Sequence, residues 1–164
     1  EISNKKPKSL ILDLRNNPGG FLDVAVTIAG YFIEQGKVVA RIEYPNREEV
    51  HTSSGSGVLG QYPLVILINK GSASASEILA GALRDNNVGR IIGETSYGKG
   101  TVQEFTTYVD GSSLKITVAN WITPNRVEIN KNGIVPDIEV PLTKEDKIAG
   151  RDPQMDRALG ELRK

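Results

Sequence analysis

Three short, nearly continuous apolar runs constrain the fold of this chain more than any other feature. They are SLILDL at residues 9–14, PLVILI at 63–68 and GRIIGE at 89–94. Runs of this length, bounded by turn-forming residues, are typical of strands that are buried on both faces. We therefore expect three buried strands, and we expect 9–14 to lie inside a sheet rather than at its bare edge.

Segments with helical spacing alternate with these runs. Apolar residues recur at helical intervals over 21–32, and again in the segment that follows PLVILI, at Ile78, Leu79, Ala82 and Leu83. Residues 36–44 have the composition of a further strand. The order of strands and helices in the first half, followed by a β-rich second half, predicts a layered α/β domain.

The second half has its own pattern. Residues 101–109 and 113–124 are β-rich and are joined by the turn DGSS, and 132–142 read as an extended, edge-like segment broken by prolines. Asp152 followed by Pro153 predicts the start of a closing helix, with the aspartate as its cap.

Composition excludes several classes of function. Lys plus Arg and Asp plus Glu are both 20, so the formal net charge is zero and nothing indicates a nucleic-acid partner. Cysteine is absent, which removes disulfides, thiolate ligands and cysteine nucleophiles, and one histidine is too few for a usual zinc site. No apolar run reaches the length of a membrane span. We expect neither a metal nor a cofactor.

The stretch GETSYGKGT, residues 93–101, has the glycine and lysine spacing of a phosphate-binding loop. Such a loop needs Ser or Thr directly after its lysine and a helix that begins there. Gly100 follows Lys99, and 101–109 reads as a strand. A nucleotide site is therefore not indicated, which leaves a solvated lysine in a glycine-rich turn or a lysine with another chemical role.

Ser74, in INKGSASASEI, admits two interpretations. With Glu77 three residues later it forms a capping box, so it can simply cap a helix. At a helix start, however, the amide of Ala75 could also stabilise an oxyanion formed when the Ser74 hydroxyl attacks a carbonyl. A second donor could come from the bare backbone at Gly19 and Gly20.

A serine nucleophile needs a base to take its proton. His51, the one histidine, lies in a polar stretch that does not favour a triad. A lysine can serve when burial lowers its pKa from about 10.4 towards about 7–8, and Lys99 follows an apolar strand. If 99–103 is extended, Lys99, Thr101 and Gln103 share a face, so Gln103 could orient the lysine without adding charge. An ordinary exposed strand residue remains the alternative for Gln103.

Five separated motifs together resemble the tail-specific, or C-terminal processing, serine proteases. They are LILDLRNNPGG, GSASASEILAGAL, GETSYGKGTVQ, ITPN with NGIVPDIEV, and DPQMDRAL. The resemblance implies a Ser/Lys dyad with Ser74 as nucleophile, Lys99 as base and Gln103 as helper. It also implies oxyanion donors at the amides of Gly20 and Ala75. One departure is Arg126, where relatives often have Gly in a turn.

The resemblance further implies a fold similar to the ClpP/crotonase class and endopeptidase activity on protein or peptide substrates, recognised by their C-terminal tails. Family members usually act outside the cytoplasm, as periplasmic, membrane-associated or secreted proteins. Residues 1–164 are expected to form a single domain, the C-terminal portion of such a catalytic core, with no PDZ domain. A catalytically silent peptide-binding module of the same fold is the alternative. We also expect either self-association into a homo-oligomer or a longer parent protein.

Overall fold

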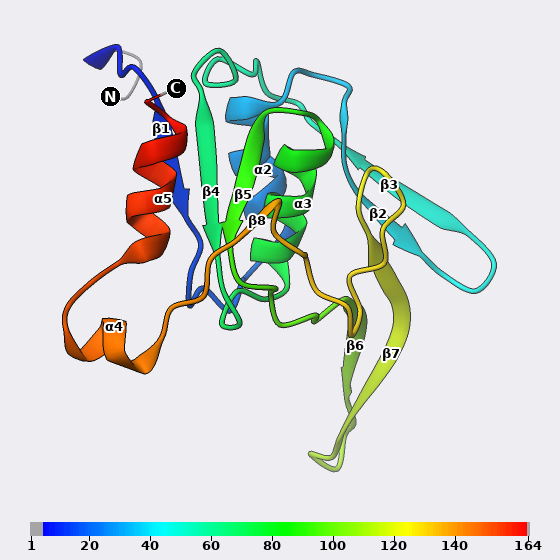
Figure 1. Ribbon diagram of the computed structural model, residues 1–164. Helices are drawn as coiled ribbons and strands as arrows, with labels where there is room; N and C mark the ends of the chain where they lie inside the picture. The colour runs from blue at the N-terminus through cyan, green and yellow to red at the C-terminus, as the bar shows by residue number, and fades with distance from the viewer. Residues whose placement is uncertain (1–4, 164) are drawn as a thin grey trace.

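The computed structural model of the protein describes residues 5–163, which form two sheets with helices between and beside them (Figure 1). The first sheet is entirely parallel and has the order β1-β4-β5-β8. Its strands are β1 (Leu10–Asp13), β4 (Leu64–Ile68), β5 (Gly89–Gly93) and β8 (Ile138–Glu139). The carboxyl ends of β1, β4 and β5 therefore meet at one edge, and the loops that leave them are neighbours.

The second sheet is antiparallel and has the order β3-β2-β7-β6. Its strands are β2 (Val38–Glu43), β3 (Glu48–Thr52), β6 (Thr101–Thr107) and β7 (Ser113–Ile122). The β6–β7 hairpin projects beyond the body of the molecule as a two-stranded ribbon (Figure 1). Its base, where β6 begins, connects directly to the loop that leaves β5.

Two helices, α2 (Leu22–Phe32) and α3 (Ala75–Asp85), lie between the sheets, and α5 (Pro153–Glu161) covers the other face of the parallel sheet (Figure 1). A short helix, α4 (Lys144–Ile148), precedes α5. The α5 helix begins as predicted, because Asp152 accepts a hydrogen bond from the Met155 amide and Pro153 occupies the first turn. None of the helices within residues 5–163 has the length and apolar character to cross a membrane.

The main hydrophobic core lies between the two sheets. All five residues of β4 are buried, and they alternate between two clusters. Leu64, Ile66 and Ile68 face α2 and α3, whereas Val65 and Leu67 face Ala158 of α5. Helices on both faces explain why the sequence of this strand is apolar without alternation.

The layered α/β class and the buried β4 and β5 strands are confirmed, but the predicted place of residues 9–14 is wrong. β1 is an edge strand that pairs only with β4 among the described strands. Its side chains are still partly covered, because Leu10 and Leu12 pack towards the main core and Ile11 packs towards α5. Helices on both faces of the sheet are therefore enough to make an edge strand apolar.

Two further features concern β3 and Arg126. The charged segment that contains His51 forms strand β3, although its sequence reads as polar loop. Pairing with β2 explains this, since an edge strand with one solvated face accepts polar and charged residues. Arg126 has a φ of 65°, a left-handed conformation that suits glycine.

Candidate active site

Ser74 lies in the turn between β4 and α3, at the carboxyl edge of the parallel sheet. It is the N-cap of α3 and has a φ of 54° and a ψ of −121°, an unusual backbone conformation for a serine. Such a conformation costs of the order of 1–3 kcal/mol and persists only where surrounding contacts hold it. Here the Ser74 amide donates to Glu77 Oε2 (2.8 Å), and its carbonyl accepts from the amides of Glu77 and Ile78.

Two backbone donors beside Ser74 are free. Among the residues that the structure describes, neither the amide of Gly20 nor that of Ala75 has a hydrogen-bond partner. Ala75 is the first residue of α3, where helix geometry leaves amides unpaired. Gly20 follows the tight turn after β1, and a Cβ built on it meets nothing within 4 Å. The arrangement leaves two donors available to an oxyanion.

The loop that contains Gly20 packs closely against the turn that contains Ser74. A Cβ on Gly19, whose φ is 95°, would lie 2.5 Å from the Ala73 carbonyl oxygen and 2.8 Å from the Ala75 nitrogen. The Asn17 carbonyl accepts from the Ala73 amide (3.0 Å). Only glycine permits this approach, so the geometry of the turn depends on position 19 having no side chain.

Asn16 and Asn69 make a second lock between the same loops. The Asn16 amide donates to Asn69 Oδ1 (2.9 Å), and Asn69 Nδ2 donates to Asn16 Oδ1 (3.1 Å). Ser72 Oγ donates to the Leu14 carbonyl (2.8 Å) and fixes the same junction. Asparagines in turns are common, so the sequence alone did not show that these two pair with each other.

Glu77 joins the turn of Ser74 to the loop of Lys99. Its carboxylate is fully buried and accepts four hydrogen bonds. Oε2 accepts from the amides of Ser74 (2.8 Å) and Lys99 (3.0 Å), and Oε1 accepts from the Gly98 amide and Ser96 Oγ (both 2.6 Å). The backbone nitrogens of Ser74 and Lys99 therefore lie within two hydrogen-bond lengths of each other. The sequence predicted Glu77 only as part of a capping box.

The side chains of the predicted catalytic group are not joined to one another. Lys99 is exposed, and no hydrogen bond or ion pair links its Nζ to any residue within 5–163. Lys99 lies in the loop before β6. Of the three residues predicted to share one face of an extended segment, only Thr101 and Gln103 are therefore in the strand. Gln103 is exposed and donates to Thr117 Oγ1 at 3.5 Å. The structure brings the backbones of Ser74 and Lys99 together but leaves Gln103 bound to its neighbouring strand.

Other chemistries that the sequence left open find no support. His51 lies in β3 opposite Ala40, and its Nε2 is buried without a partner in the described part of the chain. Lys99 is followed by a strand rather than a helix, unlike the lysine of a phosphate loop. Within residues 5–163, no group of His, Cys, Asp or Glu side chains is arranged to hold a metal ion.

An apolar cavity of about 220 Å³ lies directly beside Ser74, between α2 and α3. Its wall includes both free-amide residues, Gly20 and Ala75, so it opens next to the candidate oxyanion site. The remainder is mostly apolar, contributed by Leu14, Phe21, Val24, Ala25, Ile28 and Leu79. A pocket of this composition accepts an apolar side chain from a group bound at Ser74.

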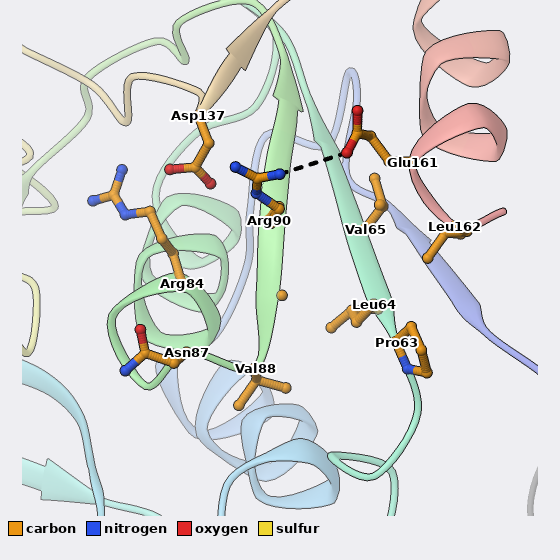
Figure 2. A pocket seen from close by; sticks show the side chains of 11 residues that line it. Pro63, Leu64, Val65, Arg84, Asn87, Val88, Arg90, Asp137, Glu161 and Leu162 are labelled. Atoms are coloured by element: carbon orange, nitrogen blue, oxygen red, sulfur yellow. Dashed lines mark hydrogen bonds and ion pairs between the residues drawn. The ribbon is translucent and has the colours of Figure 1, made fainter. Parts of the chain in front are cut away.

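A larger and more polar cavity of about 610 Å³ lies at the opposite end of the parallel sheet, where β4 and β5 begin (Figure 2). Arg90 and Glu161 face each other across it at 3.5 Å, and Asp137 accepts from the Ile91 amide (2.7 Å). None of the predicted site residues lines this cavity. The predicted site residues lie instead near the loops at the carboxyl edge of the parallel sheet.

Comparison with known families identifies the family of this chain. The model of peptidase family S41 matches residues 1–140, most of the sequence. The chain belongs to this family.

Two curated relatives are similar over the same region. The chain is 42% identical over 141 residues to the carboxy-terminal processing protease CtpA of Bacillus subtilis (strain 168), covering 86% of this chain and 30% of that protein. It is 39% identical over 140 residues to the chloroplastic C-terminal processing peptidase of Tetradesmus obliquus, covering 85% and 30%. The chain thus spans less than a third of the length of these relatives.

A solved structure, the photosystem II D1 C-terminal processing protease, has the same fold. It superimposes with a TM-score of 0.80 at 38% identity, covering 85% of this chain and 36% of that one. The fold class expected from the sequence agrees with this comparison.

Proposed function

We propose that this chain carries the catalytic centre of a serine endopeptidase that cleaves protein substrates at or near their C-termini. Ser74 is the nucleophile, Lys99 is the general base and Gln103 orients the lysine. The observation that carries the proposal is the pair of free amides, Gly20 and Ala75, beside a serine held in a strained turn. Family membership and the names of the relatives agree with this chemistry.

The first step is attack of Ser74 Oγ on the scissile carbonyl. The Oγ–C bond forms as the proton passes to a neutral Lys99 amine, and the amides of Gly20 and Ala75 hold the oxyanion. The C–N bond then breaks, and Lys99 returns the proton to the leaving amine. In the second step, water deprotonated by Lys99 hydrolyses the acyl-enzyme and frees Ser74.

Substrate binding has to complete this arrangement. Catalytic hydrogen bonds are often long or misaligned in free enzymes and tighten only in the complex. The shared Glu77 oxygen holds the backbones of Ser74 and Lys99 close together, and the proposal requires the exposed lysine side chain to turn towards Ser74. The proposal also requires Gln103, on the edge strand β6, to leave Thr117 and turn towards Lys99.

The substrate class follows from the surfaces next to Ser74. The bare backbone at Gly19 and Gly20 allows an extended peptide to approach. The apolar cavity accepts the side chain of the residue before the scissile bond. No nucleic acid or cofactor is required. We place the protein outside the cytoplasm, in line with the family resemblance, and the relative from Tetradesmus obliquus is chloroplastic.

Cleavage of an unfolded protein by the full-length protein tests the proposal. Ser74→Ala and Lys99→Arg should each reduce kcat by about 10³-fold or more, since a nucleophile and its base act as a unit and Arg stays protonated. Ser54→Ala and Lys70→Arg, at exposed positions, serve as matched controls. Near-normal cleavage by Lys99→Arg would refute the role of Lys99 as general base. A wild type that binds the peptide without cleaving it would support the alternative, a catalytically silent binding module.

The role of the tail needs a separate comparison. One unfolded protein is offered with a free C-terminus and with an amidated C-terminus. We expect the free form to be cleaved faster, and equal rates would mean that the tail is not what is recognised.

A further inference from the structure

The N-terminus of α5 contacts the loops of the candidate active site through one half-buried arginine. Arg15 lies two residues after the end of β1, and its side chain is 13% exposed. Its Nε and Nη2 donate to the two oxygens of Asp13 (2.9 and 2.7 Å). Its Nη1 donates to Asp152 Oδ1 (2.8 Å) and to Gln154 Oε1 (3.1 Å). Arg15 is thereby held by the cap of the last helix and by a residue of its first turn.

Gln154 extends the contact to the other side of the site. It is fully buried, and its Nε2 donates to the Val140 carbonyl (2.8 Å). The Val140 amide in turn donates to the Gly93 carbonyl (2.8 Å), at the start of the loop that leads to Lys99. The start of α5 therefore connects the root of the Gly20 loop with the root of the Lys99 loop. We call the set Arg15, Asp152 and Gln154 the α5 clasp.

Arg15 adds to the bonds that already hold the Gly20 loop, which are the Asn16–Asn69 pair and the Ser72 bond to the Leu14 carbonyl. Residues 16–18 are exposed, and Asn16 has a φ of 56°, in the left-handed region that asparagine adopts more readily than most residues. Arg15 is the residue immediately before this turn. Its fork of donors can hold Asp13 and the α5 residues at once, which a lysine cannot do.

We propose that Arg15, Asp152 and Gln154 are positioning residues. They hold the loop of the oxyanion amides and the Lys99 loop in fixed positions relative to each other, so that docking of α5 is required for full activity. This inference rests on the proposed function of the same site. Asp152 and Gln154 lie beyond residues 1–140, the part of the chain that the family model matches. The clasp acts through the loops and touches no substrate.

The test is a set of conservative variants in the full-length protein. Asp152→Asn keeps a cap for α5, because Asn caps helices as well as Asp, but it removes the charge that faces Arg15. Arg15→Lys keeps the charge but loses the fork. Asp156→Asn is the matched control, since it removes a carboxylate from the exposed side of the same helix.

We expect Asp152→Asn and Arg15→Lys to lower kcat by about 10-fold or more with KM changed less than about 2-fold, a fraction of the loss that follows removal of an oxyanion donor. Amide hydrogen exchange of residues 16–20 and 94–99 should accelerate at a temperature where both variants remain folded. The double variant should be no slower than the slower single variant, because both changes break one contact.

Equal kcat and equal exchange in Asp152→Asn and Asp156→Asn would overturn the inference. A wild type that cleaves nothing would instead refute the proposed function. In that case the exchange experiment still decides whether α5 holds the two loops.

Discussion

At the scale of single residues, a buried carboxylate does more for the candidate site than the sequence indicated. Ser74, Gly20 and Ala75 were predicted from motif and helix-start chemistry, and the structure places them together. The function of Glu77 as the link to Lys99 was not predictable, because one of its donors lies 3 residues away in the chain and the others lie 19 to 22 residues away. Only the fold brings these segments together.

Glu77→Gln tests this link. An amide can accept at one atom only, so two of the buried donors now bonded to Glu77 lose their acceptor at about 1–3 kcal/mol each. We expect the free energy of unfolding to fall by about 3 kcal/mol in urea denaturation, with cleavage lost. Glu94→Gln, which removes only an ion pair with the exposed Lys70, is the control. A Glu77→Gln protein as stable as that control would show that the carboxylate is not the link.

At the scale of secondary structure, apolar periodicity predicted most strands and helices, and tertiary pairing decided the rest. The α3 and α5 helices begin where their caps predicted. Strand β3 was missed because its charged side chains are tolerated by an edge strand, a property of its neighbours and not of its own sequence. The orientation of Gln103 could not be predicted either, since it depends on β7 and on the irregular register between Val102 and Gln103.

Helix α2 should set the preference for the residue before the scissile bond. Val24 lines the apolar cavity and is 53% exposed, so Val24→Asp changes the cavity without disturbing the core. We expect kcat/KM to fall by about 10-fold or more for peptides with a large apolar residue there, because a charge would face that side chain. Thr27→Asp, exposed on the same helix, is the control, and peptide kinetics give the comparison. An unchanged preference would place the specificity elsewhere.

The cap of helix α5 should make the free energy of unfolding depend on pH in the acid range. The hydrogen bond from Arg15 holds the pKa of Asp152 below its ordinary value of 3.8. Because the pKa is lower in the folded state, ionised Asp152 stabilises the fold above about pH 4, and this contribution is lost as the pH falls through the folded pKa. Urea unfolding at pH 7 and pH 3 should therefore show a stability gap between wild type and Asp152→Asn that narrows in acid. A gap that stays constant would mean that the ion pair does not stabilise the fold.

At the scale of the whole molecule, the two-sheet architecture explains why the site lies where it does. Parallel strands bring the Gly20, Ser74 and Lys99 loops to one edge, and α2 and α3 supply the apolar cavity beside them. The same architecture leaves one edge of β1 without a partner among the described strands. An open apolar edge is a template for association.

We therefore predict that the 164-residue chain self-associates through β1. The amides of Leu10 and Leu14 donate towards β4, so alternation points the Ile11 amide outwards. Ile11→Pro removes that outward donor, a change that edge strands tolerate. Sedimentation equilibrium should show a dimer for the wild type and a monomer for Ile11→Pro, with circular dichroism confirming that the variant is folded. A wild type that is monomeric at high concentration would contradict this prediction.

The central claim is that Ser74 is a nucleophile activated by Lys99, and covalent labelling measures this directly. A fluorophosphonate probe reacts with activated serine hydroxyls, and peptide mass mapping identifies the labelled residue. We predict one adduct, on Ser74, with a labelling rate that falls by about 10²-fold or more in Lys99→Arg and is unchanged in Lys70→Arg. An adduct on another serine, or equal labelling of Ser74 in Lys99→Arg and wild type, would contradict the account.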